Sequence, residues 1–293
     1  MDNYRFYFQK NNTYLGDCLS VVYKVSPKEK KKDNITGDHI TIFVKSPKSI
    51  GCIGSEVDFK RYFETNLFNP DRPTLLRVAS ECFLGTFGDS HCDCESQKIS
   101  SLKAINDFGQ GVYIHIPHEA QGRGLFYKAE ELSLQVSGLN QQGNYVGCMD
   151  VDIASKYILG KDSTLDIRGY RIIKKIISEL GLNKYTYRLI TSNSNKLKII
   201  KNDLGIDLVG SLDVNQNYTV ENVAEVLAKI HNKFFKVSEI DLKRLHNTVI
   251  TSNNFPMRLK ILSKKLEEGM SKGTVYNCSH ALLSEIVTKI NRS

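Results

Sequence analysis

Hydrophobic positions in the first two thirds of the chain alternate between two spacings. Short runs rich in β-branched and aromatic residues predict strands, and apolar residues that recur every three or four positions predict helices. The expected strands are residues 17–24, 39–44, 111–116 and 185–190. The expected helices are residues 99–108, 127–135 and 172–180, and glycines at 109 and 181 end the first and the last of them. Strands and helices therefore intermingle along this part of the sequence.

From about Thr219 onward the pattern contains only helices. The expected helices are residues 220–235, 238–246, 256–268 and 279–290. Ser238 and Asp241 have the spacing of a capping box at the start of the second one. The last helix carries an apolar stripe, which we expect to pack on the rest of the chain. We therefore expect two domains, residues 1–215 and a helical C-terminal extension of residues 216–293.

Composition and charge narrow the class of protein. No apolar run approaches the ~18 residues of a membrane span, and the N-terminus lacks the apolar stretch of a signal peptide, so we expect a cytoplasmic protein. Seven scattered cysteines do not resemble a disulfide framework and are expected to be reduced. A formal net charge of +8 predicts attraction to polyanions such as nucleotides or nucleic acids. The lysine-rich residues 26–33 are expected to form an exposed loop.

Three of these cysteines, Cys82, Cys92 and Cys94, are close together in the sequence. Three thiolates can hold a zinc ion and leave its fourth position for water, which is the arrangement of a catalytic zinc site. A structural zinc site would need a fourth ligand, for which His91 is the nearby candidate. A third interpretation is that the cysteines are small buried hydrophobic residues. Their spacing alone does not decide among the three.

Two polar loops are candidates for phosphate binding. Gly122 and Gly124 flank Arg123 just before a predicted helix, which suggests backbone lying close to a ligand, although such glycines also occur in ordinary turns. Residues 191–196 lead from a predicted strand into a helix, and free N–H groups at a helix N-terminus suit an anion. The alternative is a capped turn with Ser194 or Asn195 as the N-cap residue.

Together these segments resemble the GTP cyclohydrolase II family over roughly residues 15–215. The family motif Arg-Val-x-Ser-Glu-Cys, followed by Cys-Asp-Cys and a glutamine, occurs from Arg77 to Gln97. Partial matches to three further motifs follow in order: residues 118–125 with Lys128, residues 166–170, and residues 191–196. The resemblance implies an α/β fold (an α+β mixed sheet with flanking helices) and assigns catalysis to residues 1–215.

What the resemblance implies about chemistry is specific. Cys82, Cys92 and Cys94 would hold one zinc ion per subunit, and an activated water would attack C8 of the guanine ring of GTP. Asp166 would accept a proton, and Arg168 would act as a nucleophile toward the α-phosphate. Since arginine stays protonated, its chemistry favours an electrostatic clamp instead. Pyrophosphate and formate would leave, as in riboflavin biosynthesis.

The resemblance also assigns substrate contacts and partners. The family positions for nucleotide binding correspond here to Arg77, Ser80, Glu81, Gln97, Glu119, Gln121, Arg123, Thr191 and Lys196. Cationic side chains among them suit the phosphates, and Glu119 is the candidate reader of the guanine edge. Mg²⁺ would accompany the triphosphate, and a homodimer is expected. Membrane binding is not expected, and nucleic acid is a less favoured partner.

Several positions depart from the family. Ala120 and Gln121 stand where the family has glycine and arginine, Leu132 stands where it usually has tyrosine, and Gly169 replaces an aspartate. These departures keep open a divergent paralogue with another nucleotide substrate or a formylated product. A different class is a non-catalytic, zinc-stabilised nucleic-acid-binding protein that uses the positive charge.

Overall fold

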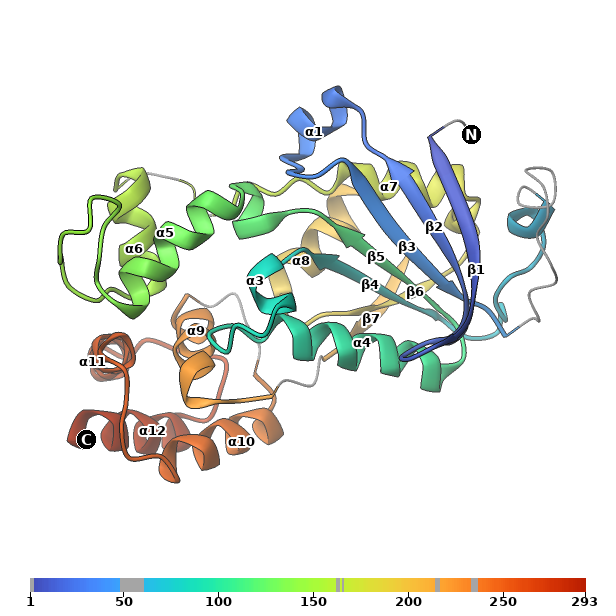
Figure 1. The fold of residues 1–293 in the computed structure, drawn as a ribbon. Coiled ribbons are helices and arrows are strands. Elements are labelled where there is room, and N and C mark those ends of the chain that lie inside the picture. Colours follow the sequence, from blue (N-terminus) through green and yellow to red (C-terminus); the bar gives the residue numbers. More distant parts are fainter. Residues whose placement is uncertain (1–2, 48–60, 162–163, 165, 214–216, 233–236) are drawn as a thin grey trace. The chain divides into compact units, whose positions relative to one another are not determined.

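The structure is a computed structural model, and it describes residues 3–47, 61–161, 164, 166–213, 217–232 and 237–293 (Figure 1). The chain divides into two compact units. The first unit comprises residues 1–82, 97–122 and 167–214, and the second comprises residues 83–96, 123–166 and 215–293. Among the described residues, no helix is both long enough and apolar enough to cross a membrane.

A seven-stranded mixed sheet is the centre of the first unit, with strand order β1-β2-β3-β5-β4-β6-β7. The strands are β1 (Tyr4–Asn12), β2 (Gly16–Lys24), β3 (His39–Lys45), β4 (Thr74–Ser80), β5 (Gly111–Ile116), β6 (Tyr187–Ile190) and β7 (Leu208–Leu212). β1, β2, β3 and β5 pair antiparallel, whereas β5, β4, β6 and β7 run parallel. The mixed α/β fold expected from the sequence is therefore confirmed.

Helices cover both faces of the sheet around its central strands. The helix α7 (Arg171–Glu179) buries four isoleucines in the same apolar cluster as Leu76 and Val78 of β4. The alternate residues Leu75 and Ala79 belong to a second cluster with Leu102 of α4 (Cys94–Phe108). This alternation follows from the two-residue period of a strand. It explains why β4 is buried along nearly its whole length.

The lysine-rich segment that was expected to be a loop is the helix α1 (Pro27–Asp33), so that prediction was wrong. Ser26 caps it, and Glu29 completes the capping box. At the other end Asp33 is buried, and its carboxylate accepts a hydrogen bond of 2.7 Å from the backbone N–H of Ile172, at the start of α7. Local capping and one long-range contact therefore fix a segment whose composition indicated only solvent exposure.

The same buried carboxylate explains one departure from the family. A Cβ atom on Gly169 would lie 2.4 Å from Asp33 Oδ1 and 2.6 Å from Asp33 Cα. The backbone N–H of Gly169 also donates to the Asp33 carbonyl at 2.9 Å. Because the aspartate from α1 fills this space, the family's aspartate would not fit at position 169 without movement of the backbone.

The second unit contains most of the remaining helices. They are α3 (Phe83–Thr86), α5 (Leu125–Val136), α6 (Val151–Leu159), α9 (Val220–His231), α10 (Glu239–Ile250), α11 (Met257–Ser271) and α12 (His280–Arg292). The last four share one apolar core, and both α10 and α11 pack on α12. The capping box at Thr219 starts α9, and Ser238 caps α10 as its spacing predicted. The C-terminal residues thus have a hydrophobic core of their own.

Candidate metal and nucleotide site

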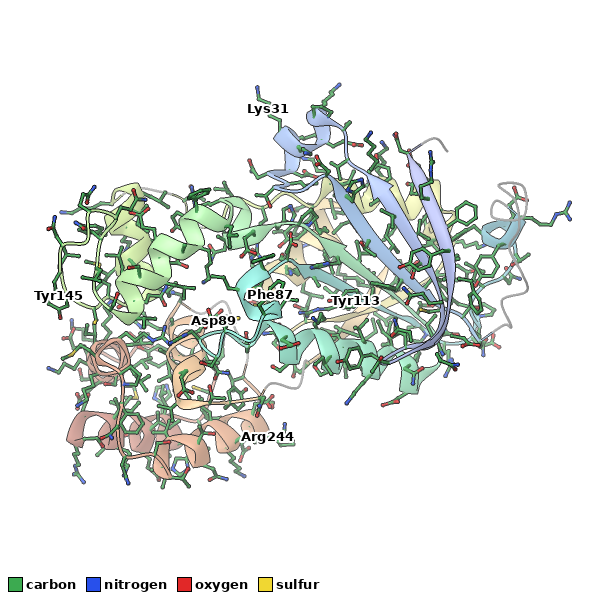
Figure 2. All side chains as sticks on the ribbon, in the orientation of Figure 1. Lys31, Phe87, Asp89, Tyr113, Tyr145 and Arg244 are labelled. Carbon is green, nitrogen blue, oxygen red and sulfur yellow. The ribbon has the colours of Figure 1, made fainter. Side chains whose placement is uncertain are left out.

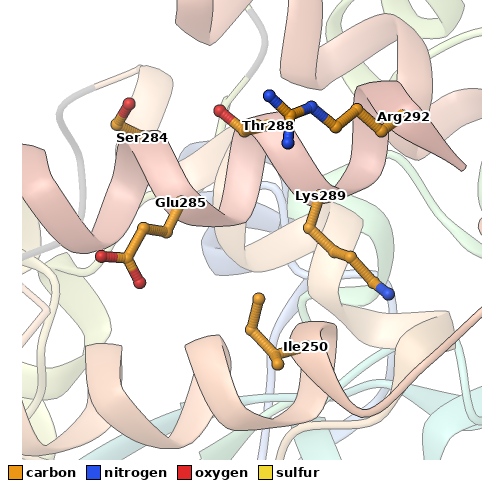
Figure 3. Close-up of a pocket in the computed structure, with 6 residues that line it drawn as sticks. All are labelled: Ile250, Ser284, Glu285, Thr288, Lys289 and Arg292. Atoms are coloured by element: carbon orange, nitrogen blue, oxygen red, sulfur yellow. The ribbon is translucent and has the colours of Figure 1, made fainter.

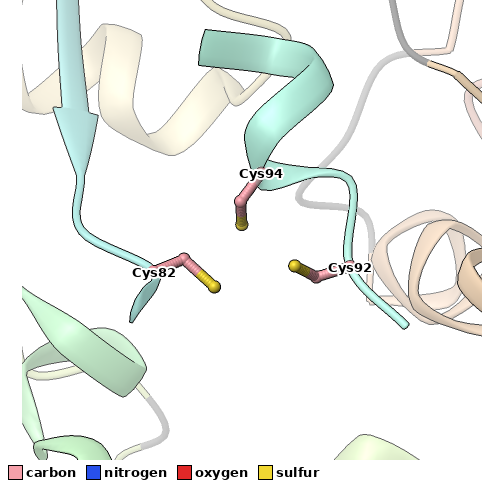
Figure 4. Close-up of side chains that lie close together, drawn as sticks. All are labelled: Cys82, Cys92 and Cys94. Atoms are coloured by element: carbon pink, nitrogen blue, oxygen red, sulfur yellow. The ribbon is translucent and has the colours of Figure 1, made fainter. Parts of the chain in front are cut away.

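The three clustered cysteines come together in space. Cys82 directly precedes α3, Cys94 begins α4, and the side chains of all three cysteines point toward one another (Figure 4). The Sγ atoms of Cys82, Cys92 and Cys94 all lie within 4.8 Å of one another, and all three residues are half-buried. A tetrahedral zinc with Zn–S distances of about 2.3 Å spaces its sulfurs about 3.8 Å apart. The donor set and its spacing therefore fit a zinc ion.

His91, the candidate fourth ligand of a structural site, has another partner. Its Nδ1 lies 2.7 Å from Asp89 Oδ1, and its backbone N–H donates to the same carboxylate. Although burial opposes the effect, these hydrogen bonds lower the pKa of Asp89. In the described part of the chain the metal-competent group consists of the three cysteines alone. A three-ligand site is what this geometry favours.

The loop between Cys82 and Cys92 exposes aromatic side chains. Phe87 is 76% exposed, and its ring lies 4.7 Å from that of Phe83, centroid to centroid. Phe87 and Asp89 are labelled on this loop in Figure 2. Cys92 Sγ lies 3.9 Å from the carbonyl oxygen of Asp89, which ties the two ends of the turn together.

Several of the other expected site residues follow the ends of three neighbouring parallel strands. β4 ends at Ser80, β5 ends at Ile116, three residues before Glu119, and β6 ends at Ile190, directly before Thr191. Ligands of open α/β sheets bind at the carboxyl ends of parallel strands, because loops from neighbouring strands meet there. Ser80, Glu81 and Cys82 follow one another at the end of β4, the central strand of the three.

Arg77 braces two of these strands. It is only 8% exposed, and its guanidinium donates to the Ile190 carbonyl at 2.9 Å and to Gln97 Oε1 at 3.0 Å. Lys196 makes a similar connection, because its Nζ lies 3.2 Å from the carbonyl oxygen of Val78. Its ammonium group also lies 5.5 Å from the centre of the Tyr170 ring. Both cationic side chains are thus hydrogen-bonded to backbone carbonyl groups of the parallel strands.

Arg168 also reaches the end of β4, where its Nη1 donates to Ser80 Oγ at 3.0 Å. Asp166, its companion in the family motif, is exposed. Glu119 is buried, and its carboxylate accepts a hydrogen bond from the backbone N–H of Ala120. Burial and the nearby carboxylate of Glu119 raise the pKa of Glu81. Arg168, Ser80, Glu81 and Glu119 therefore share one region of the first unit.

The glycine-rich loop differs from a simple phosphate cradle. Ala120 and Gln121 both adopt positive φ angles, of 48° and 60°, and Gln121 is exposed. A Cβ on Gly122 would lie within 3.3 Å of Asn34 and Ile167 atoms, so glycine is needed there for close packing. Arg123 donates to the carbonyl of Thr164, and its guanidinium lies 5.5 Å from the ring centre of Tyr127. Leu132 is half-buried on α5.

The residue that caps the helix after β6 was assigned to the wrong position. Asn193, not Ser194 or Asn195, is the N-cap of α8 (Ser194–Lys198), and its Oδ1 accepts from the backbone N–H of Lys196 at 2.9 Å. The helix is short and continues into a π-helical turn, η3 (Ile199–Asp203). Thr191 is buried, and its Oγ1 accepts from the N–H of Asn193. The loop is a capped turn that aims Lys196 at β4.

Sequence reasoning missed two polar residues. His118 is buried against the Tyr170 ring, with its Nε2 atom 2.9 Å from the carbonyl oxygen of Asp33. Asp93, between two of the cysteines, is also buried and contacts Lys229 of α9. His118 was visible as part of a motif, whereas no local signal connected residues 93 and 229.

A pocket in the second unit lies away from these residues in the sequence. It lies between α10 and α12, and its lining residues are Ile250, Ser284, Glu285, Thr288, Lys289 and Arg292 (Figure 3). None of the expected metal or nucleotide residues lines it.

A mixed α/β sheet with three clustered cysteines that begin two residues after a parallel strand defines a class of α/β proteins with a metal-competent site. Comparison with known proteins narrows that class. The family model for GTP cyclohydrolase II matches residues 13–213. The chain belongs to the GTP cyclohydrolase II family, a family of hydrolases.

Individual relatives agree with this assignment. The chain is 31% identical over 146 residues to GTP cyclohydrolase-2 of Colwellia psychrerythraea, which covers 50% of this chain and 64% of that relative. It is 32% identical over 174 residues to GTP cyclohydrolase-2 of Pasteurella multocida, and this match covers 56% of this chain and 72% of that relative. A match to the riboflavin biosynthesis protein RibBA of Bacillus cytotoxicus has 35% identity over 128 residues, covering 43% and 28%. The chain thus spans about two thirds of the length of the GTP cyclohydrolase-2 relatives.

Proposed function

We propose that this chain is a zinc-dependent hydrolase that opens the imidazole ring of the guanine base of GTP and releases pyrophosphate and formate. The product would be a diaminopyrimidine ribosylamino phosphate of the riboflavin-pathway type. The observation that carries the proposal is the cluster of Cys82, Cys92 and Cys94 sulfurs within 4.8 Å. Membership of the GTP cyclohydrolase II family supports the choice of substrate.

The metal would be held by the three cysteines. When bound, zinc would supply a Lewis acid and an activated water. Three thiolates leave its fourth position open, which distinguishes a catalytic from a structural site. Cys82 follows the end of β4 by two residues, and Ser80 at that end already contacts Arg168. The metal ligand and the proposed phosphate-binding arginine are therefore linked through the end of one strand.

Arg168 would hold the triphosphate and stabilise charge that develops at the α-phosphate. A guanidinium is planar, stays charged and offers paired donors, which suits a clamp better than a nucleophile. Lys196 and Arg123 would add cationic contacts, with Mg²⁺ neutralising the remaining phosphate charge. Asp166 is exposed and would accept a proton at the edge of the site.

The base would be read by acidic and amide groups. Glu119 is buried three residues after the end of β5, where its carboxylate can accept hydrogen bonds from the guanine N1–H and amino groups. Gln97 lies against Arg77, so the two would act together beside Ser80, Glu81 and Thr191. Gln121 would contact the substrate from the loop after β5.

The remaining assignments are proposals as well. Residues 1–215 would carry catalysis, with residues 216–293 as a helical extension. We propose a cytoplasmic homodimer with GTP as its ligand and without a role for membranes or nucleic acid.

Two departures from the family favour a second candidate, a divergent paralogue with a formylated product or another nucleotide. Leu132 replaces the family's usual tyrosine, and its side chain has no hydrogen-bonding group. Gln121 replaces an arginine, while Arg123 donates to the Thr164 carbonyl. A late hydrolytic step or phosphate recognition would then differ from the family pattern.

Product analysis tests both candidates. Zinc-loaded protein is incubated with GTP and Mg²⁺, and every product is identified by mass spectrometry. Pyrophosphate, formate and a diaminopyrimidine are expected. A formylated pyrimidine without free formate would favour the paralogue, and Leu132→Tyr should then restore formate release. Unchanged GTP, together with strongly salt-sensitive nucleic-acid binding, would instead favour the non-catalytic alternative.

A further inference from the structure

The loop that carries two of the three cysteines is held by the C-terminal helices. Asp93 lies between Cys92 and Cys94, and its side chain is 1% exposed. Its Oδ1 is 3.3 Å from Nζ of Lys229, on α9. Lys229 also pairs with Glu225, one helical turn earlier, at 3.1 Å. A buried carboxylate is stable only when it is paired or hydrogen-bonded, so this lysine supports the burial of Asp93.

Two further contacts connect the same parts of the chain. Thr219 Oγ1, at the N-cap of α9, donates to the Ser90 carbonyl at 3.5 Å. The backbone N–H of Asn217 lies at the same distance from Ser96 Oγ. The N-cap residue of α9 and the chain just before it therefore contact residues on both sides of Cys92 and Cys94.

The helix α9 is a rigid support for these contacts. Val226, Leu227 and Ile230 are at most 1% exposed, and they belong to the apolar core that α9 shares with α10, α11 and α12. Arg258 of α11 fixes it further, because its guanidinium donates to the Glu221 carbonyl. Lys229 thus projects from a well-packed element onto a loop with little regular structure of its own.

The charges around Lys229 also favour a supporting role for this residue. Burial alone would lower the pKa of Lys229, but the carboxylates of Asp93 and Glu225 outweigh it and raise that pKa. A divalent cation with three thiolates carries one net negative charge, which a nearby cation stabilises. Without Lys229, the buried Asp93 carboxylate would lose a cationic partner beside this negative centre.

We propose that Lys229 is a positioning residue of the metal centre, which holds Asp93 so that Cys92 and Cys94 direct their thiolates at one ion. The inference rests on the proposed metal site, but it assigns a role to a residue outside the segment that matches the family model, which ends at residue 213. The metal centre is then completed by the C-terminal helices.

Zinc affinity is the measurement that separates positioning from general stability. Zinc is titrated against a chromophoric chelator with the wild-type chain and with Lys229→Met. Partners of the ligand residues typically contribute 10–100-fold to metal affinity, and we expect a loss of about that size. Lys229→Arg, which keeps the charge, should restore most of the affinity.

Lys265→Met is the matched control. Lys265 pairs with Asp150, the N-cap residue of α6, and the side-chain exposures of this pair, 31% and 3%, nearly equal those of Lys229 and Asp93, 28% and 1%. The control should lower the thermal midpoint of the metal-free protein about as much as Lys229→Met does, while zinc affinity stays at the wild-type value.

Asp93→Asn provides a second route if Lys229→Met does not fold. It should weaken zinc binding as well, and combining it with Lys229→Gln should add little, because the two residues act as one pair. Equal zinc affinity in the wild type and all Lys229 variants would overturn the role of Lys229 alone. Absence of zinc binding by the wild-type chain would overturn the proposed metal site itself.

Discussion

The candidate site residues are held in two different ways. Arg77, Ser80 and Thr191 lie on or directly after strands of the sheet, where backbone hydrogen bonds fix their positions. The cysteine loop, residues 83–93, contains one helix of four residues and otherwise depends on side-chain contacts such as that between Asp93 and Lys229. The sheet fixes the positions of the residues at the strand ends, whereas contacts with residues far away in the sequence fix the conformation of the loop.

This difference indicates which parts of the candidate site tolerate changes in sequence. Residues at strand ends keep their position when neighbouring loops change, because the ladder of hydrogen bonds stays in place. A loop held by a few side chains changes with its partners. The family match covers β2 to β7 but ends before α9, so the proposed support of the metal loop lies outside the segment that the family model matches.

Removal of one thiolate should have the largest effect. Cys94→Ser takes away a proposed metal ligand, and we expect the proposed zinc-dependent reaction to fall by at least about a thousandfold, because a bound ion would contribute several kcal/mol to the transition state. Metal content and turnover of GTP are measured together. The control is Cys148→Ser, at another half-buried cysteine, which should leave both unchanged. Retention of zinc and activity in Cys94→Ser would refute the three-cysteine site.

A smaller effect is expected at the strand ends. Arg168→Ala removes a cation from the end of β4 but leaves the sheet intact, so kcat should fall about a hundredfold while zinc content stays at the wild-type level. Arg171→Ala, three residues further on and exposed, is the control. If Arg168→Lys keeps part of the activity, the residue acts as a clamp. A variant with wild-type kinetics would exclude Arg168 from the site.

Much of this arrangement could be predicted from local sequence. Ile172 and its neighbours have helical spacing, and the α7 helix appears where that pattern predicts it. The order of the motifs also indicated the family, which the family comparison confirms, whereas the grouping of Cys82, Arg168 and Lys196 in one site stays a prediction. The predictions of α7 and of the family succeeded because short-range periodicity and motif spacing depend on residues close together in the chain.

The remaining features depend on distant partners. Asp33 sits in a lysine-rich segment, and nothing nearby indicated that its carboxylate would meet the start of α7, 139 positions away. Lys229 is one of many lysines, and its contact with Asp93 spans 136 positions. Such contacts arise from tertiary packing, which one sequence without its relatives does not reveal.

The smallest expected effect on activity comes from a residue of the sheet whose substitution changes stability at acidic pH and leaves turnover near neutral pH unchanged. Burial lowers the pKa of His115 on β5 to about 4, and the charge of Lys98 on α4 acts in the same direction. As the pH falls, His115 therefore takes up a proton at a higher pH in the unfolded chain than in the folded chain. Stability contributed by neutral His115 is complete above about pH 6.5 and is lost as the pH falls toward 4, by about 3 kcal/mol of unfolding free energy. Denaturant unfolding of His115→Gln across this range should show a flatter pH dependence than the wild type, whereas His39→Gln, at an exposed position on β3, should keep the wild-type slope. Equal slopes in all three proteins would mean that the sheet does not keep His115 neutral. The strands that carry the candidate site residues would then be less shielded from water than their burial indicates.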